Sequence, residues 1–213
     1  MTAVIPALSA APFHEGVGFD LLRHGDTGQR SYRGQLDDAL TVQGWAQLRG
    51  AVVGRRWDRI VSSSLRRCAD FAIELAKQRG LALRIDPRLA EYHFGQWQGV
   101  PMETLGEEQP EALGRFWADP MANPPPGAET FHAFARRLSQ ALDEAVGAPG
   151  ERVLVVTHGG AIRLLRCLAE GRDFGDMAGI EVAHASIHRV RWPASARAAD
   201  VVSSSDALAS ERC

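Results

Sequence analysis

The sequence predicts an α/β fold, a three-layer α/β/α sandwich whose central sheet is mostly parallel and which carries a small inserted helical segment. Strand and helix signals alternate along the chain, which favours helices packed on a parallel sheet. Residues 152–157 (RVLVVT) form a continuous apolar run, which is typical of a strand buried on both faces. With 213 residues, the chain is long enough to bury a core without disulfides or a structural metal.

The individual elements follow from short apolar runs and from helical periodicity. Apolar runs that end at polar or glycine-containing loops predict strands at 19–22, 59–62, 81–85, 152–157 and 186–192, the last at an edge of the sheet. Amphipathic spacing and terminal signals predict helices at 42–56, 65–79, 129–146 and 161–169. Between residues 101 and 118, Gly106, Pro110 and Gly114 predict several short helices instead of one long one.

These elements predict one domain over residues 17–193, with residues 97–128 as the inserted helical segment. Residues 1–16 and 194–213 are rich in small and polar residues, which predicts a disordered extension and a flexible tail. The first of these lacks the features of a signal peptide, and no apolar run in the chain approaches the length of a membrane span. We therefore expect a cytoplasmic protein.

Charge and cysteine content limit the function further. The formal net charge is −2, so no overall basic field attracts nucleic acid or anionic lipid, and any anion site must be a local pocket. The three cysteines show no CxxC spacing, which predicts neither a disulfide framework nor a zinc site and fits a reducing compartment.

Two histidines stand at the ends of predicted strands. His24 follows the first strand and His158 follows the buried 152–157 strand, and each precedes a glycine. Ligands of open α/β sheets bind outside the carboxyl ends of the strands, so both side chains are expected at the binding edge. Arg23 and Arg67 add permanent cations near this edge. Together these groups predict a cage for a phosphoryl group, without the carboxylate ligands that a magnesium-dependent phosphatase needs.

Each residue also has a structural interpretation when it is taken alone. Arg23 and His24 could belong to a surface turn, and His158 could be a hydrogen-bonded core histidine. Arg67 could lie on the polar face of a helix, and Glu91 could be a solvated loop carboxylate. Their order along the chain is what favours the catalytic interpretation.

Five motifs in that order carry a resemblance to a known family. They are LLRHGDT at 21–27, GQLD at 34–37 with LT at 40–41, SSSLRR at 62–67, LAE at 89–91 with FGQW at 94–97, and VVTHG at 155–159. This pattern resembles the histidine phosphatase superfamily, in the branch that includes the cofactor-dependent phosphoglycerate mutases. The resemblance spans about residues 18–192 and implies the α/β fold expected above.

The resemblance implies a role for each main candidate. His24 would be the nucleophile that forms a phosphohistidine. Glu91 would be the general acid and then the general base. Arg23, Arg67 and His158 would neutralise the phosphoryl oxygens.

The resemblance also implies four further contacts to substrate or phosphate, from Gly34, Gly159, Thr27 and Arg30. No metal and no cofactor are implied.

The substrate class is less specific. The segment NPPPGAETF at 123–131, followed by FARR at 134–137, resembles the α-ribazole phosphatases of cobalamin assembly most closely. This implies α-ribazole 5′-phosphate, a small phosphate monoester, as the partner, and a homodimer as a candidate assembly. Broad-specificity phosphatases, phosphoglycerate mutases and phosphohistidine protein phosphatases stay open as alternatives. A catalytically inactive phospho-ligand-binding module is the alternative from another class.

Two smaller sets of residues complete the candidates. His184 and His188 are four apart, which on a helix would suit one metal ion, but the stretch leads into a predicted strand. We therefore expect structural or surface histidines there. Trp97 and Trp117 are candidates for contact with a substrate ring.

Overall fold

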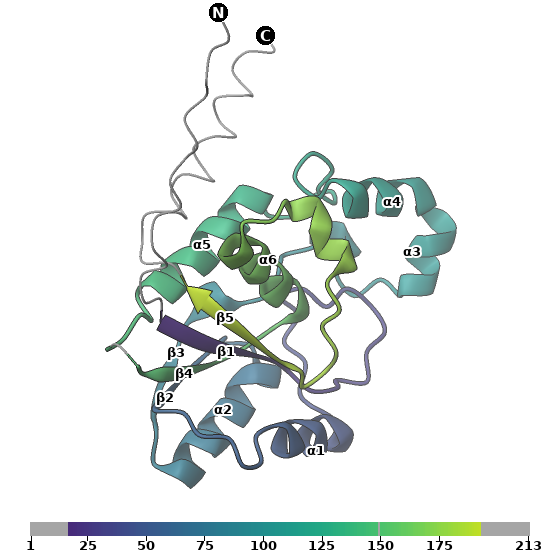
Figure 1. Ribbon diagram of the computed structural model, residues 1–213. Coiled ribbons are helices and arrows are strands. Elements are labelled where there is room, and N and C mark those ends of the chain that lie inside the picture. The colour runs from purple at the N-terminus through teal and green to yellow at the C-terminus, as the bar shows by residue number, and fades with distance from the viewer. Residues whose placement is uncertain (1–16, 149, 193–213) are drawn as a thin grey trace, which may run out of the picture.

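The central sheet has five strands and forms the middle layer of the structure (Figure 1), a computed structural model that describes residues 17–148 and 150–192. The strands are β1 (Val17–Arg23), β2 (Arg59–Ser62), β3 (Ala82–Ile85), β4 (Arg152–Thr157) and β5 (Ile187–Trp192), in the order β3-β2-β4-β1-β5. All neighbours pair in parallel except β5, which runs antiparallel to β1 at the edge. The predicted mostly parallel sheet and the edge position of the last strand are confirmed.

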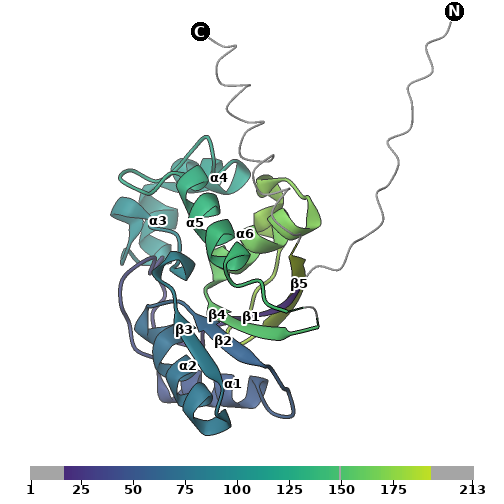
Figure 2. The same cartoon turned by 90° about the vertical axis from the view of Figure 1, so that its left-hand side faces the viewer.

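Helices cover both faces of this sheet. α1 (Val42–Ala51) and α2 (Arg66–Arg79) lie on one face, and α5 (Phe131–Asp143) and α6 (Gly159–Glu170) lie on the other (Figure 2). α3 (Met102–Glu108) and α4 (Pro110–Ala118) lie to one side, beyond the α5–α6 layer. The predicted three-layer sandwich is therefore confirmed.

Side chains that alternate along the strands build two cores. In β1, Leu21 belongs to the core under α5 and α6, and Leu22 belongs to the core under α1 and α2. β4 divides its side chains in the same way, since Val155 faces the first core and Val156 the second. This alternation follows from the period of two in a strand, and it explains the continuous apolar run in the sequence.

Local signals set the helix ends. The hydroxyl of Thr41 accepts from the backbone N–H of Gly44 at 3.0 Å and begins α1, and Gly80, with φ of 64°, ends α2 in the left-handed conformation. The predicted helix at 42–56 is too long, because α1 stops at Ala51 before a turn.

Only one break interrupts the predicted helices between 101 and 118. The break falls at Gln109, and Pro110 begins α4 directly after it. Proline suits this position because it has no backbone N–H, and the N–H of the first helical residue has no acceptor within the helix. Gly106 and Gly114 lie inside helices, where nothing surrounds the position of an added Cβ.

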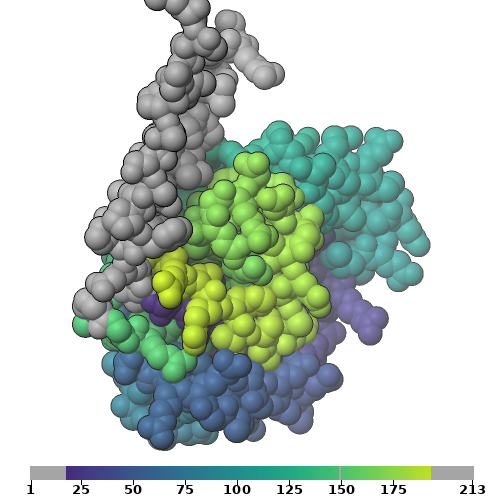
Figure 3. Space-filling view, in the orientation of Figure 1, coloured from purple at the N-terminus to yellow at the C-terminus, as the bar shows by residue number. Residues whose placement is uncertain are grey.

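The last elements of the described chain lie at the front of the molecule in the view of Figure 3. A 3₁₀ segment, η3 (Phe174–Gly179), and the loop that follows it lie between the α1–α2 layer and the α3–α4 pair (Figure 3).

Two further 3₁₀ turns, η1 (Pro87–Leu89) and η2 (Gly95–Trp97), follow β3. No helix in residues 17–148 or 150–192 is long and apolar enough to cross a bilayer.

Some sequence predictions lie wholly or partly outside the described residues. They concern the extension at 1–16, the tail at 194–213 and Cys213. Cys68 and Cys167 are both buried and free.

Candidate active site

The carboxyl ends of the four parallel strands meet around one cavity of about 290 Å³. Arg23 is the last residue of β1 and His24 follows it directly, and Arg67 comes from the first turn of α2, after β2. Glu91 reaches the same cavity from the segment that follows β3 and η1. His158 follows β4. The sheet thus brings the five main candidates to one edge, as the sequence predicted.

His24 is held as a neutral imidazole with a defined tautomer. Its Nδ1 lies 2.8 Å from the carbonyl oxygen of Gly25, and because a carbonyl only accepts, Nδ1 carries the hydrogen. The lone pair is therefore on Nε2. Burial, followed by the nearby charge of Arg67, lowers the pKa of His24 well below its ordinary value. The ring is uncharged near neutral pH and can act as a nucleophile through Nε2.

Two glycines let the His24 loop pack directly on α1. A Cβ at Gly25 would overlap the backbone of Gly44, and a Cβ at Gly44 would overlap the backbone of Asp26. The carboxylate of Asp26 also accepts from the hydroxyl of Thr41, the residue that caps α1, at 2.8 Å. Backbone contacts of this kind fix the position of His24 relative to the helix.

Arg67 is almost completely buried, with 1% of its surface exposed, and its bonds hold the loop in front of it. Nη1 donates to the carbonyl of Leu36 at 2.6 Å and Nη2 donates to the carbonyl of Gly34 at 2.7 Å. Gly34 has φ of 49° and no room for a Cβ beside Gln98, which explains the glycine there. Each terminal nitrogen of Arg67 keeps one further hydrogen for a ligand in the cavity.

Arg23 offers an unused buried donor. Its Nη1 donates to the carbonyl of Val182 at 2.6 Å, and its Nη2 lies 3.0 Å from Nε2 of His184. Its Nε is buried and has no hydrogen-bond partner among the described residues. A buried donor without an acceptor is costly, so an oxygen of a bound anion in the cavity would stabilise this arrangement.

Glu91 is fixed at the start of α6. Its Oε2 accepts from the N–H of Gly160 at 2.9 Å, and its Oε1 accepts from the N–H of Ala161 at 3.1 Å. The guanidinium of Arg137, on α5, donates to the backbone carbonyls of the 88–91 segment and so holds the main chain that carries Glu91. The carboxylate therefore has one position relative to the cavity.

His158 lies behind Arg67 and does not line the cavity. Its ring centroid is 5.3 Å from that of His24. Its Nδ1 accepts from Nε of Arg67 at 3.2 Å, and its Nε2 lies 2.8 Å from the hydroxyl of Ser63. In this arrangement both ring nitrogens are engaged and the ring positions Arg67, so a direct contact with phosphate stays a prediction.

The other predicted contacts divide into two groups. Gly34, Gly159 and Thr27 line the cavity. Arg30 does not, because its side chain is exposed and only its backbone carbonyl is used, accepting from the N–H of Met102 at 3.0 Å. The structure therefore does not bring the Arg30 side chain to the site.

The far wall of the cavity comes from the 29–33 loop and from α3 and α4. Ser31 forms an isolated antiparallel bridge with Pro101, and the indole N–H of Trp117 donates to the hydroxyl of Tyr32 at 2.7 Å. Trp117 lines the cavity, whereas Trp97 is buried beside it and does not.

Four charged or titratable groups of the cavity were missed by sequence reasoning, namely His184, Arg163, Arg33 and Tyr32. His184, which was expected to be a structural or surface residue, lines the cavity, with its ring 5.6 Å from that of His24. Arg163 lines it from α6. The position of Arg163, five residues after His158 and at the start of the second turn of α6, was the available signal.

The described residues contain no group of three or more His, Cys, Asp or Glu side chains that could hold a metal ion. His184 lies in a loop and His188 in β5, so the two are not on one helix face.

The fold and the site define an α/β protein with a neutral histidine and several arginines at the carboxyl edge of its sheet, an arrangement suited to phosphate. A family model, the histidine phosphatase superfamily (branch 1), matches residues 19–204. The chain belongs to this superfamily.

Several curated relatives are similar in sequence. A bifunctional protein of Mycobacterium tuberculosis is 38% identical over 158 residues, which are 70% of this chain and 43% of that protein. The match thus spans less than half of that relative. A glucosyl-3-phosphoglycerate phosphatase of M. tuberculosis is 36% identical over 161 residues, covering 68% and 71% of the two chains. A metal-independent phosphoserine phosphatase of Arabidopsis thaliana is 33% identical over 157 residues, covering 68% and 65%.

Solved structures agree with this family. The mycobacterial glucosyl-3-phosphoglycerate phosphatase superposes with a TM-score of 0.74 at 30% identity, covering 83% of this chain and 96% of that one. An Escherichia coli protein, provisionally assigned as an α-ribazole-5′-phosphate phosphatase, superposes with a TM-score of 0.69 at 26% identity, covering 82% and 89%.

Proposed function

We propose that the chain is a metal-independent phosphomonoester hydrolase that works through a phosphohistidine at His24. The observation that carries the proposal is the neutral His24 ring, whose free Nε2 belongs to a cavity that also contains the guanidinium groups of Arg23 and Arg67. A histidine that binds phosphate only by charge would need to be protonated. A neutral ring in a cationic cavity instead suits attack on phosphorus.

The reaction has two steps with balanced bonds and protons. In the first, Nε2 of His24 attacks phosphorus, the P–N bond forms, the P–O bond to the alcohol breaks, and Glu91 donates a proton to the departing oxygen. In the second, Glu91 takes a proton from water, the water oxygen attacks phosphorus, a P–O bond forms and the P–N bond to His24 breaks, which releases inorganic phosphate and neutral His24. Arg23 and Arg67 stabilise the negative charge of the equatorial oxygens during both transfers.

The placement of Glu91 favours an enzyme over an inactive phospho-ligand-binding module. A module that only binds a phosphate anion has no use for a carboxylate in the same cavity, because like charges repel. Here the carboxylate lines the cavity and is held by three backbone N–H groups, those of Tyr92, Gly160 and Ala161. A carboxylate in this position is useful to an enzyme, because it can transfer a proton to the departing oxygen or take one from the attacking water.

Two substrates have support. The similarity to glucosyl-3-phosphoglycerate phosphatase, in sequence and in structure, favours a phosphorylated glycerate derivative. The 26% identity to the E. coli structure supports α-ribazole 5′-phosphate, the substrate that the 123–137 segment suggested, less strongly. We propose a small phosphate monoester and place both compounds first in the substrate panel.

The test is phosphate release in excess EDTA, with wild type compared with His24→Ala and with His132→Ala. His132 lies on α5, away from the cavity, and makes a matched control for the loss of an imidazole. We expect EDTA-resistant activity in wild type and His132→Ala and none in His24→Ala. A phosphoenzyme quenched at alkaline pH should be found only where His24 is present. Activity that EDTA abolishes, or that survives in His24→Ala, would overturn the proposal.

A further inference from the structure

The cavity holds more positive charge than a phosphate dianion needs. Of the arginines that line it, Arg33 is already neutralised, because its Nε and Nη2 both lie 2.8 Å from the carboxylate of Asp38. Arg23, Arg67 and Arg163 have no carboxylate partner among the described residues. Glu91 is the one carboxylate of the described residues that lines the cavity.

Arg163 is the guanidinium group that the reaction does not use. Its Nε donates to the carbonyl of Ile180 at 2.9 Å, which fixes the side chain along α6. Within residues 17–148 and 150–192, no acceptor binds its two terminal nitrogens. A Cβ built on Gly159 would lie 3.3 Å from Nη1 of Arg163 and 3.4 Å from Nε of Arg23, so both groups flank the same point of the wall. Arg163 therefore lies beside the phosphate cradle, which is formed by Arg23 and Arg67, and the N–H groups of its two terminal nitrogens are free to bind another group.

The charge balance changes when Glu91 is ready to act as an acid. In that state Glu91 is protonated and neutral, and three guanidinium charges face the substrate. A phosphate dianion compensates two of them. One positive charge is left without a partner in a partly buried cavity, and such a charge is stabilised by a matching anion.

We propose that Arg163 binds a carboxylate on the leaving group, so that the preferred substrate is a phosphate monoester of a small hydroxy acid. This inference rests on the proposed function and names the substrate class of the same site. A carboxylate suits the planar guanidinium, since two parallel N–H groups can donate to its two oxygens.

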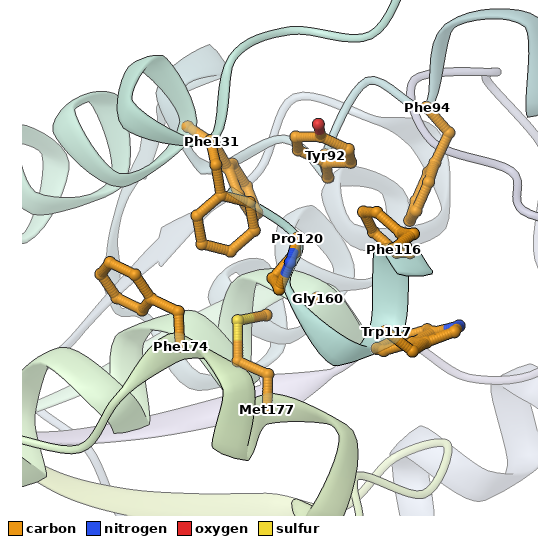
Figure 4. Close-up of a pocket in the computed structure, with 10 residues that line it drawn as sticks. Tyr92, Phe94, Phe116, Trp117, Pro120, Phe131, Gly160, Phe174 and Met177 are labelled. Carbon is orange, nitrogen blue, oxygen red and sulfur yellow. The ribbon is translucent and has the colours of Figure 1, made fainter. Parts of the chain in front are cut away.

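The rest of the cavity fits an uncharged remainder of modest size. Tyr32 and Trp117, joined by their hydrogen bond, form an aromatic wall on the side of the cavity that faces away from the strand ends. Behind Trp117, the rings of Phe116 and Phe131 and the side chain of Met177 close a second pocket of only about 20 Å³, which has space for one water-sized group (Figure 4). The leaving group is therefore confined to the main cavity, whose 290 Å³ is at the small end for a ligand site.

The test compares two substrates that differ in one group. 3-Phosphoglycerate carries a carboxylate where glycerol 3-phosphate carries a hydroxymethyl group. For wild type we expect kcat/KM to favour 3-phosphoglycerate by about 10- to 100-fold, the range for hydrogen bonds to a charged group. In Arg163→Gln this preference should disappear, and in Arg163→Lys it should be partly restored. Arg166→Gln, one turn further along α6 and paired with Glu170, is the matched control.

Inhibition by inorganic phosphate provides the second measurement. Phosphate has no carboxylate, so its inhibition constant should be similar in wild type and Arg163→Gln if the cradle is intact. A much weaker inhibition in the variant would assign Arg163 to the phosphate cradle and overturn the inference. Equal kcat/KM values for the two substrates in wild type would also overturn it, while leaving the phosphohistidine mechanism in place. Absence of any phosphoenzyme would instead overturn the proposed function, and the inference with it.

Discussion

The substitution Gly160→Ala tests whether the position of Glu91 controls the chemistry. A Cβ at residue 160 would lie 2.5 Å from Oε1 of Glu91, whereas ordinary contacts begin at 3.4 Å. The carboxylate must therefore move by about 1 Å, a displacement that can cost an enzyme about 10²-fold in rate. A positioned acid typically contributes about 10²–10⁴-fold to the rate. We therefore expect Gly160→Ala to lose about 10²-fold, the lower end of this range.

The assay is kcat/KM on an alkyl phosphate and on an aryl phosphate. An alkoxide needs a proton as it leaves and a phenolate needs little help, so Gly160→Ala should lose about 10²-fold on the alkyl phosphate and far less on the aryl phosphate. Helix propensity favours alanine over glycine by about 1 kcal/mol, so unfolding of α6 does not explain such a loss. Gly114→Ala, in α4 with nothing within 4 Å, is the control. Equal losses on both substrates, or none, would refute the assignment of Glu91 as the acid.

Three further outcomes follow from the buried charges. Arg67→Lys has three donors for four acceptors, namely the carbonyls of Leu36 and Gly34, Nδ1 of His158 and a phosphoryl oxygen. kcat/KM should therefore fall by about 10²–10³-fold, and a fall below threefold in the same assay would contradict the role of Arg67. The pKa values of His24 and His158 are lowered by burial, so the unfolded chain takes up protons first as pH falls below about 6.5. The free energy of unfolding, measured in urea, should then fall by about 1.4 kcal/mol per pH unit for each histidine, and a constant value between pH 7 and 5.5 would exclude this. Asp20→Ala leaves the buried indole N–H of Trp57 without its acceptor and should cost about 1–3 kcal/mol in the same measurement, whereas an unchanged midpoint would show that the bond contributes nothing.

Much of the fold could be predicted because its strands are short and strongly apolar. β2 and β4 have the predicted bounds, since both are central strands with side chains buried on both faces. The end of α1 was less predictable, because the residues after Ala51 keep helical spacing but form a turn in which Val52 is buried and Val53 and Gly54 are exposed. Gly106 and Gly114 misled the prediction because a helix on the surface tolerates glycine where no tertiary contact requires otherwise.

The site could be predicted only as far as strand ends could be located. Arg23 ends β1, and His24 and His158 directly follow strands, so topology alone brings them to one edge. Which side chain stands in front of another is set by packing, and the sequence could not show that His158 lies behind Arg67. His184 was missed because it reaches the cavity from a loop that lies before the edge strand, where no periodic pattern marks it.

The cavity has two parts with different origins, and the bridge between Ser31 and Pro101 belongs to the second. The phosphate end is built from strand termini at the centre of the sheet, and changes there would disturb the core. The opposite wall is built from the 29–33 loop and the α3–α4 pair, which lie outside the sandwich. Exchange of residues 101–121 between relatives is therefore a route by which new leaving groups can be accepted while phosphoryl transfer is retained. Both natural divergence and laboratory evolution of specificity can use this division of the cavity.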